Sequence, residues 1–444
     1  MARVAAGTPP RSWGSRLVHA LMLPAYLVEQ ARGPKRLALL ALYAMVALPI
    51  GLLAWREAQI LGIPDIGDPF DTKPLLERRV RDEDNAFVLY REAAAQFKPQ
   101  ALAWGAGLAT PTSPAARQQD WLEANAEALA TWKRATGRPD ALDTAPADLR
   151  ASTPTMTVQL LQEFARLASL EARRLRDEGD MAGALDLDLA ILRSAKHAAL
   201  AGPLVARFAG LNIRSMACRD LDEWAAEPRV DAELLRRALD AASRARADQV
   251  PISHALRYDY LATLNSMAEV DPALEGKDWH QSPLHQAFPA ATRLSCWLLH
   301  EPERGRRVYR LWMANLLAYC DRPRDERPSQ STGRFPFYLP EGDAAPEAHR
   351  LAPEELARQI EASPLARIFI SSAPQMIGYL DREALQEDAL VLTLAERLYT
   401  LEQGHPPKVM GDLLGKYLGA LPEGNSPTDP PFTSTEPIAD VAPR

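Results

Sequence analysis

The feature that most constrains this chain is an uncharged apolar segment near its beginning. Leu37 to Trp55 comprises nineteen residues, LALLALYAMVALPIGLLAW, and none of them is charged. As an α-helix rising 1.5 Å per residue, a segment of this length roughly spans a hydrocarbon core of ~30 Å. A core helix of a soluble protein would show a polar stripe, which this segment lacks. The segment is therefore predicted to be a transmembrane helix, in which Pro49 is tolerated.

Charged residues are divided unevenly on the two sides of this segment. Residues 1–36 carry six basic side chains and one acidic side chain, a balance of +5. The whole chain has a formal net charge of −7, so residues 37–444 carry −12. The basic side of a transmembrane helix usually stays in the cytoplasm. We therefore expect an N-terminal cytoplasmic tail, the lipid bilayer of the inner (cytoplasmic) membrane around Leu37 to Trp55, and a periplasmic main domain.

A cleaved signal peptide is the competing interpretation of the apolar segment. Against it, the preceding 36 residues are long for the basic region of a signal peptide, and neither an A-x-A site nor a lipidated cysteine follows. We therefore favour an uncleaved signal anchor in a single-pass protein. The tail is interpreted either as an amphipathic helix on the membrane surface over Trp13 to Gln30 or as a flexible basic segment that only sets the topology.

Beyond the apolar segment, the hydrophobic residues follow a helical period. Leu160, Leu161, Phe164 and Leu167 illustrate it. Alternation typical of strands is nearly absent, so the predicted fold is all-α, either a helical-hairpin bundle or an irregular α-solenoid-like array outside one transmembrane helix. Helices are expected over residues 85–97, 114–135, 154–179, 203–226, 231–248, 252–269, 289–300, 304–320 and 376–404, with a further helix capped by Asp180.

Proline, glycine and charge mark the boundaries of the predicted segments. The expected order is a basic cytoplasmic tail (1–36), a transmembrane helix (37–55), a juxtamembrane linker (56–83), an α-helical domain (84–320), a polar Pro-rich loop (321–350), a C-terminal helical segment packing on the domain (351–422) and a disordered tail (423–444). The loop is predicted to be a boundary or an exposed binding surface.

A Gly-Asp turn within residues 172–195 is similar to the turn of a tetratricopeptide repeat. Ala184 and Leu185 follow the turn as in that repeat. The first helix lacks the usual Trp and Leu-Gly pattern, and no second copy follows 34 residues later. Since one repeat cannot bury its own apolar face, we favour a helical hairpin inside a larger bundle.

Three aspartates, Asp65, Asp68 and Asp71, recur at intervals of three residues just after the apolar segment. Hard cations such as calcium bind clustered carboxylates. The EF-hand pattern is absent, however, because no glutamate stands at its twelfth position. We therefore expect solvated or turn-capping aspartates rather than a calcium site.

Cysteines and histidines give little support for a metal site or a disulfide. The chain has three cysteines, Cys218, Cys296 and Cys320, and no C-x-x-C. In a simple hairpin the last two lie at different distances from the turn, so buried thiols are expected rather than a bridge. The densest group of soft ligands is His280, His285, Cys296 and His300. The last of these is expected to end a helix, and no metal is predicted.

No catalytic signature is recognisable. The chain contains no G-x-S-x-G, H-E-x-x-H, P-loop or dinucleotide fingerprint. The carboxylates of Asp186 and Asp188 are expected on different helix faces, both solvated. The acidic balance, with a pI near 5.7, argues against a broad nucleic-acid surface. We therefore assign no catalytic, cofactor-binding or metal-binding residue, no cofactor and no nucleic-acid partner.

The C-terminal part is similar to a pseudopilin pattern, in which an extended helix ends in Tyr-x-Leu-x-x-Gly before a Leu-x-x-Leu-x-x-Tyr-Leu segment. The long helix predicted over 376–404 ends in the sequence LAERLYTLEQGHPP, residues 394–407, with a Gly-His-Pro turn. Residues 412–432 are expected to begin with a short amphipathic helix containing Leu413, Leu414, Tyr417 and Leu418. The N-terminal membrane helix lacks the glutamate of a pseudopilin, and its terminal strands are missing. The resemblance therefore implies an accessory role at most.

Over most of its length the chain resembles uncharacterised membrane-anchored helical proteins of planctomycete-type bacteria. The residues that carry this resemblance are Gly62 to Asp71, Asp84 to Arg91, Glu301 to Arg304 with Ala314 to Leu317, and Gly404-His405-Pro406. It implies a fold and a topology but no activity. The function predicted from the sequence is a membrane-anchored extracytoplasmic scaffold or protein-interaction module with an unknown envelope partner. The alternatives are an envelope-directed hydrolase and an accessory subunit of a secretion or pilus-like assembly.

Overall fold

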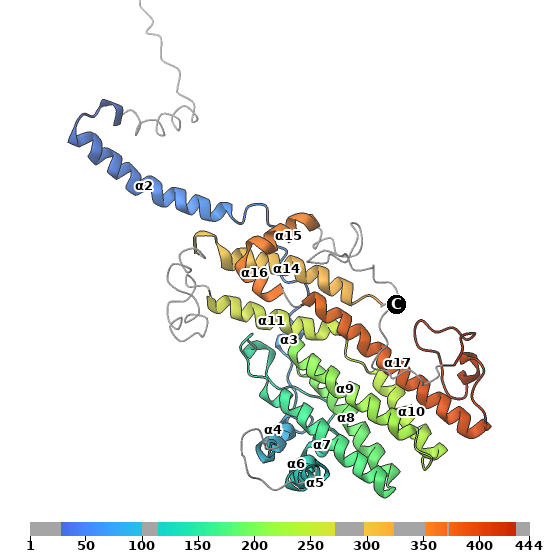
Figure 1. The fold of residues 1–444 in the computed structure, drawn as a ribbon. Coiled ribbons are helices and arrows are strands. Elements are labelled where there is room, and N and C mark those ends of the chain that lie inside the picture. The colour runs from blue at the N-terminus through green and yellow to red at the C-terminus, as the bar shows by residue number, and fades with distance from the viewer. Residues whose placement is uncertain (1–27, 100–113, 271–296, 324–350, 371–372, 432–444) are drawn as a thin grey trace, which may run out of the picture.

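The computed structural model describes residues 28–99, 114–270, 297–323, 351–370 and 373–431 (Figure 1). Within these residues the elements are helical and no strand is present, which confirms the predicted all-α class. They are α2 (Pro34–Ala58), α3 (Lys73–Leu76), α4 (Ala86–Gln96), α5 (Pro114–Ala124), α6 (Ala126–Ala135), η1 (Pro146–Asp148), α7 (Met156–Glu178), α8 (Met181–Leu200), α9 (Leu204–Ala225), α10 (Ala232–Ala247), α11 (Ile252–Val270), α14 (Glu301–Cys320), α15 (Pro353–Ala362), α16 (Pro364–Ile370), α17 (Ala373–Gln403) and η5 (Met410–Leu413).

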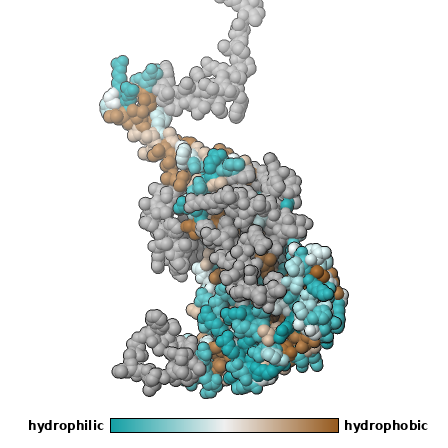
Figure 2. Space-filling view, turned by 45° about the vertical axis from the view of Figure 1, so that its right-hand side comes forward, coloured by the Kyte–Doolittle hydropathy of each residue, from teal (hydrophilic) through white to brown (hydrophobic). Residues whose placement is uncertain are grey.

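Helix α2 stands apart from the rest of the structure (Figure 1). It contains the predicted apolar segment, and none of its residues is buried. Its length and composition suffice to cross a membrane. Pro49 lies inside it, and the helix begins after Gly33, with Pro34 at its first position, where the missing amide proton costs nothing. The brown surface of this helix in Figure 2 contrasts with the largely teal body.

The centre of the body is formed by α7, α8 and α9, which pack on one another in chain order. Gly179 ends α7 in the left-handed conformation, with φ 91°, and the Asp180 side chain then caps α8 by accepting a hydrogen bond from the Gly183 amide. This confirms the predicted Gly-Asp turn within a larger bundle. Gly210 lets α8 and α9 approach closely, since a Cβ there would lie 2.8 Å from the Ala195 carbonyl oxygen.

Three large apolar clusters share this centre. The first joins α4, α5 and α6 to α7–α9. The second lies where α10, α17 and η5 pack on the other part of α7–α9. The third is formed by α11, α14, α15 and α16, and it includes Ile63 from the segment that follows α2. The body is therefore continuous, with the third cluster on the side from which α2 projects (Figure 1).

Several predicted segments differ from the structure. The helix predicted over 114–135 is two helices, because Asn125 breaks it; the Asn125 side chain accepts a hydrogen bond from the Lys98 amide at 2.7 Å. The amphipathic helix predicted after residue 412 is instead η5 and a series of turns. The predicted disordered tail contains ordered residues up to 431, since the Met410 and Gly411 amides donate to the carbonyls of Asp429 and Pro427.

Residues 56–83, predicted to be a juxtamembrane linker, are partly helical. Helix α2 extends to Ala58, and α3 forms within the remainder. Several predictions fall wholly or largely outside the described residues: the amphipathic helix over Trp13 to Gln30, the Pro-rich loop 321–350, the helix 289–300, and His280, His285 and Cys296.

Candidate functional site: the junction between α2 and the helical domain

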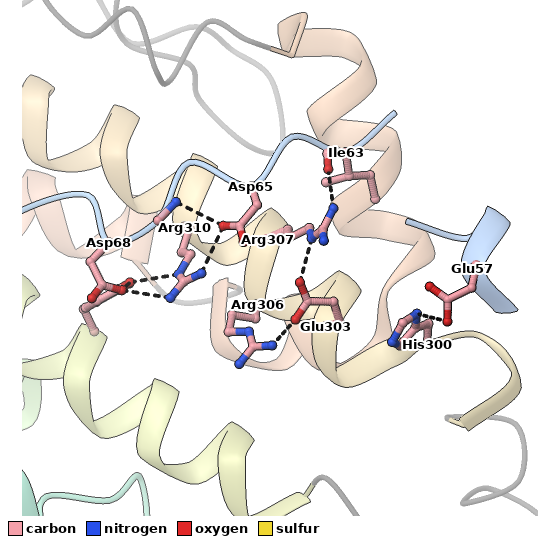
Figure 3. Close-up of polar contacts among 11 residues, drawn as sticks. Glu57, Ile63, Asp65, Asp68, His300, Glu303, Arg306, Arg307 and Arg310 are labelled. Atoms are coloured by element: carbon pink, nitrogen blue, oxygen red, sulfur yellow. Dashed lines mark hydrogen bonds and ion pairs between the residues drawn. The ribbon is translucent and has the colours of Figure 1, made fainter. Parts of the chain in front are cut away.

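The segment between α2 and α3, residues 59–72, is here called the exit segment. It lies along α14, and Figure 3 shows the side chains that hold it there. Helix α14 presents its contacts at helical spacing, since Glu303, Arg307 and Arg310 recur at intervals of four and three residues. The exit segment contributes two aspartates and one carbonyl group. One face of α14 thus binds a stretch of chain that is otherwise irregular.

Arg310 is the central contact of this junction. Its guanidinium nitrogens lie 3.0 Å from the carboxylate of Asp65 and 3.0 Å from that of Asp68. The Asp68 carboxylate also accepts a hydrogen bond of 2.6 Å from the Tyr260 hydroxyl on α11. The Arg310 side chain is 17% exposed, so these charges are partly shielded from water. One arginine therefore joins two points of the exit segment to α14.

The electrostatics of this cluster favour a charged Asp65, a charged Arg310 and a neutral Tyr260. The Gly67 amide donates a hydrogen bond to the Asp65 carboxylate, and this contact, with the positive charge of Arg310, lowers the pKa of Asp65 against the opposing effect of burial. Burial, together with the hydrogen bond to Asp68, raises the pKa of Tyr260. Burial alone would lower the pKa of Arg310, but the contacts with Tyr260 and the two carboxylates outweigh it and raise that pKa.

A second contact lies closer to α2. The Arg307 guanidinium donates to the Ile63 carbonyl oxygen at 3.1 Å and to the Glu303 carboxylate at 2.7 Å. The Ile63 side chain is 2% exposed and belongs to the apolar cluster of α14–α16. Burying an isoleucine side chain is worth ~1.5–3 kcal/mol. The same residue is thus held by its backbone and by its side chain.

A third contact involves the last turn of α2 itself. The Arg56 guanidinium lies 5.5 Å from the centroid of the Trp297 ring, within the range of a cation–π interaction. The Glu57 carboxylate lies 3.9 Å from Nδ1 of His300 (Figure 3). His300 adopts φ 52°, which is uncommon for a residue with a side chain, and it stands at the start of α14. His300 therefore lies in the turn between the helical residues 297–298 and α14; most of the helix predicted to end there lies outside the described residues.

Taken together, the three contacts hold the chain between α2 and the body against α14 along its length. Beyond α3, Arg78 donates to the Tyr258 hydroxyl and the Asp140 carboxylate, each at 2.5 Å. A segment held by ion pairs, a buried side chain and backbone hydrogen bonds behaves as part of the domain rather than as a flexible tether. This arrangement fixes the path of the exit segment along α14.

The aspartates singled out by the sequence take turn-capping roles. Asp65 accepts from the Gly67 amide and Asp71 from the Lys73 amide, each at 3.0 Å. These are the local turns expected of the residue type. The ion pairs with Arg310 were not predicted, and the only signal for them was the matching spacing of charges in two distant segments. Among the described residues, no group of three His, Cys, Asp or Glu side chains is placed to hold a metal ion.

Cysteines and other carboxylates lie elsewhere. Cys218 and Cys320 are buried in different apolar clusters. Asp186 is at the surface and pairs with Arg237, as expected of a solvated carboxylate. The expectation that Asp188 is solvated is wrong, because α7, α9 and α10 surround α8 and leave this side chain 0% exposed. Burial, and then the charge of the neighbouring Asp220, raise the pKa of Asp188 well above its usual value.

Comparison of the chain with protein-family models, with curated proteins and with solved structures finds no significant match.

Proposed function

We propose that the chain is a single-pass membrane protein whose α2 is an uncleaved signal anchor and whose helical domain is an extracytoplasmic scaffold or protein-interaction module. The observation that carries this proposal is the absence of any buried residue in α2, which lies beside a firmly docked exit segment. Leu37 and Met45 are each 71% exposed, and Leu48 is 64% exposed. Such an apolar surface is costly in water and favourable in lipid.

The junction supports retention of the anchor. A cleaved signal sequence contributes nothing to the mature fold, whereas Arg56 and Glu57 contact Trp297 and His300. The charge bias supports the orientation, with the N-terminus in the cytoplasm and the domain in the periplasm. In this arrangement Trp297 lies near the membrane surface, where tryptophan is favoured.

A pair of experiments tests anchoring and orientation. Alkaline extraction of membranes should leave the full-length chain in the pellet, and an engineered chain in which Leu40, Met45 and Leu48 are replaced by glutamine should be released. A periplasm-dependent reporter enzyme fused after Arg444 should be active, and a cytoplasm-dependent reporter should be silent. Release of the unaltered chain contradicts the anchor, and the reverse reporter pattern contradicts the orientation.

The scaffold role has its own test. The chain is extracted in mild detergent, purified with its partners and analysed by mass spectrometry. Recovery of envelope proteins above the level seen with the glutamine-substituted chain supports the role, and recovery of none contradicts it. The same preparation addresses the resemblance of the C-terminal part to pseudopilins, since an accessory subunit of a pilus-like assembly should recover pseudopilins among those partners.

A further inference from the structure

A second site, far from the exit segment in the chain, is a cavity of about 370 Å³ bounded by α8, α9, α10 and the turn that follows α6. Five basic side chains line it, and among the acidic residues only Asp248 does so. These basic residues are Arg138, Arg193, Lys196, Arg214 and Arg244. The whole protein has a net charge of −7, so this local concentration of positive charge is opposite in sign to the protein as a whole.

Two of the five cations are compensated by the protein. Lys196 lies 3.1 Å from the Asp248 carboxylate. Arg214 is buried and pairs with Glu387 of α17. The other three guanidinium groups have no carboxylate within ion-pair distance among the described residues; they belong to Arg138, Arg193 and Arg244. The charge of Asp186 acts on Arg193 from beyond ion-pair distance, and Nε of Arg244 donates to the Asp240 carbonyl oxygen of its own helix. Several arginines that line one cavity without direct carboxylate partners are an arrangement that suits phosphate groups.

The turn that carries Arg138 is held by a buried histidine. Nε2 of His197 lies 3.0 Å from the Arg138 carbonyl oxygen, and Nδ1 lies 2.8 Å from the Tyr90 hydroxyl. Burial lowers the pKa of His197 to about 4, so the ring is neutral at neutral pH. Because a carbonyl oxygen only accepts, the Nε2 proton is donated to Arg138 and Nδ1 accepts the Tyr90 proton. This chain of hydrogen bonds fixes the turn at the edge of the cavity without adding charge.

The walls of the cavity are partly apolar. Leu189 and Leu192 of α8 and Ala241 and Ala245 of α10 line it between the charged groups. A volume of this size matches small-molecule sites, and an apolar wall favours a ligand with a nonpolar body. We infer that this cavity binds a small phosphorylated organic molecule, with its phosphate held by Arg138, Arg193 and Arg244 and its body against α8 and α10.

A phosphate fits better than a carboxylate for reasons of charge. A phosphate monoester carries close to two negative charges and three acceptor oxygens at neutral pH. It therefore engages several guanidinium groups at once, whereas one carboxylate is satisfied by a single bidentate arginine. This inference concerns α8–α10 and the turn after α6, and it is independent of whether α2 lies in a membrane.

Calorimetric titration of the full chain in a non-ionic detergent tests the inference. Phenyl phosphate is the probe, benzoate the carboxylate comparison and inorganic phosphate the comparison without an apolar body. We expect phenyl phosphate to bind most tightly and added salt to weaken it. The double substitution Arg193→Gln with Arg244→Gln should reduce the affinity at least tenfold. Arg166→Gln with Arg229→Gln, two exposed arginines that do not line the cavity, should leave it unchanged.

A second measurement on the unaltered chain does not depend on any variant folding. Phenyl phosphate should slow hydrogen exchange of the amides at residues 136–140, beside the cavity, and leave the exit segment unaffected. Absence of phenyl phosphate binding overturns the inference, as does equal loss of affinity in the two double variants. Benzoate binding as tight as that of phenyl phosphate overturns the assignment to phosphate.

Discussion

Replacing Arg310 by methionine is expected to release the exit segment while leaving the rest of the domain folded. Methionine retains an apolar stem of similar reach but removes the ion pairs to Asp65 and Asp68. Ion pairs that are largely accessible to water contribute ~0.2–1 kcal/mol each. Their carboxylates are 43% and 37% exposed, so we expect the two together to contribute about 0.4–2 kcal/mol.

The loss should appear as local opening rather than as global unfolding. A change of about 0.4–2 kcal/mol corresponds to a factor of roughly 2–30 in an opening equilibrium. Hydrogen exchange followed by mass spectrometry on the full chain in detergent measures this factor. The amides of Ile63 and Gly67 are the reporters, because they donate to Ile60 and to the Asp65 side chain, respectively. Both should exchange faster in Arg310→Met, with little change in the amides of α7–α9.

Arg306→Met is the matched control on the same helix. Arg306 pairs with Glu303 and makes no described contact with the exit segment, so its loss should leave exchange at residues 59–72 unchanged. Unchanged exchange in Arg310→Met would refute the reasoning. Equal acceleration in both variants would show that loss of any α14 arginine, rather than the contact with the two aspartates, loosens the segment.

Three further predictions concern the body. Gly210→Ala should lower the free energy of unfolding by about 1–3 kcal/mol, since its Cβ would meet the Ala195 carbonyl; thermal unfolding should show no such loss for Gly419→Ala, where the space is open. The pKa of His197 is lowered to about 4 in the folded chain, so on acidification the unfolded chain takes up the proton first. The contribution of neutral His197 to stability is therefore lost as pH falls from about 6.5 to about 4. Urea titrations across this range should show a smaller loss of stability in His197→Gln. The stability contribution of Asp188 has the opposite pH dependence, because its pKa is raised in the folded state. Stability is lost as pH rises above about 4. Asp188→Asn should therefore be more stable than the unaltered chain at neutral pH, and this difference should disappear in acid.

Local signals predicted the helices well. Asp180 caps α8 and Gly179 ends α7 through interactions within a few residues, so the printed sequence suffices to place both. The break at Asn125 was missed because its cause lies at Lys98, outside any local window. The order of Pro427 and Asp429 was missed for the same reason, since their carbonyl oxygens accept from the Gly411 and Met410 amides.

The contacts of the candidate site were harder to predict from the sequence than the helices were. Arg310 and its partner Asp65 are 245 residues apart, and many other arginines in the chain have acidic residues at similar spacing. Burial of Asp188 follows from three helices packing around α8, which the helical period of α8 alone does not reveal. Helix positions are thus encoded locally, whereas ion-pair partners and buried charges depend on the assembled bundle.

The docked exit segment has a consequence for how the domain meets other proteins. A free chain of the length of residues 59–72 would let a tethered domain wander through roughly 20 Å, presenting every face in turn. With this segment fixed along α14, and with α2 in a bilayer as proposed, the domain would diffuse in the plane of the membrane at a fixed tilt to α2. Encounters with another anchored protein then become a two-dimensional search in which rotational entropy has already been lost, so a weak interface suffices for capture.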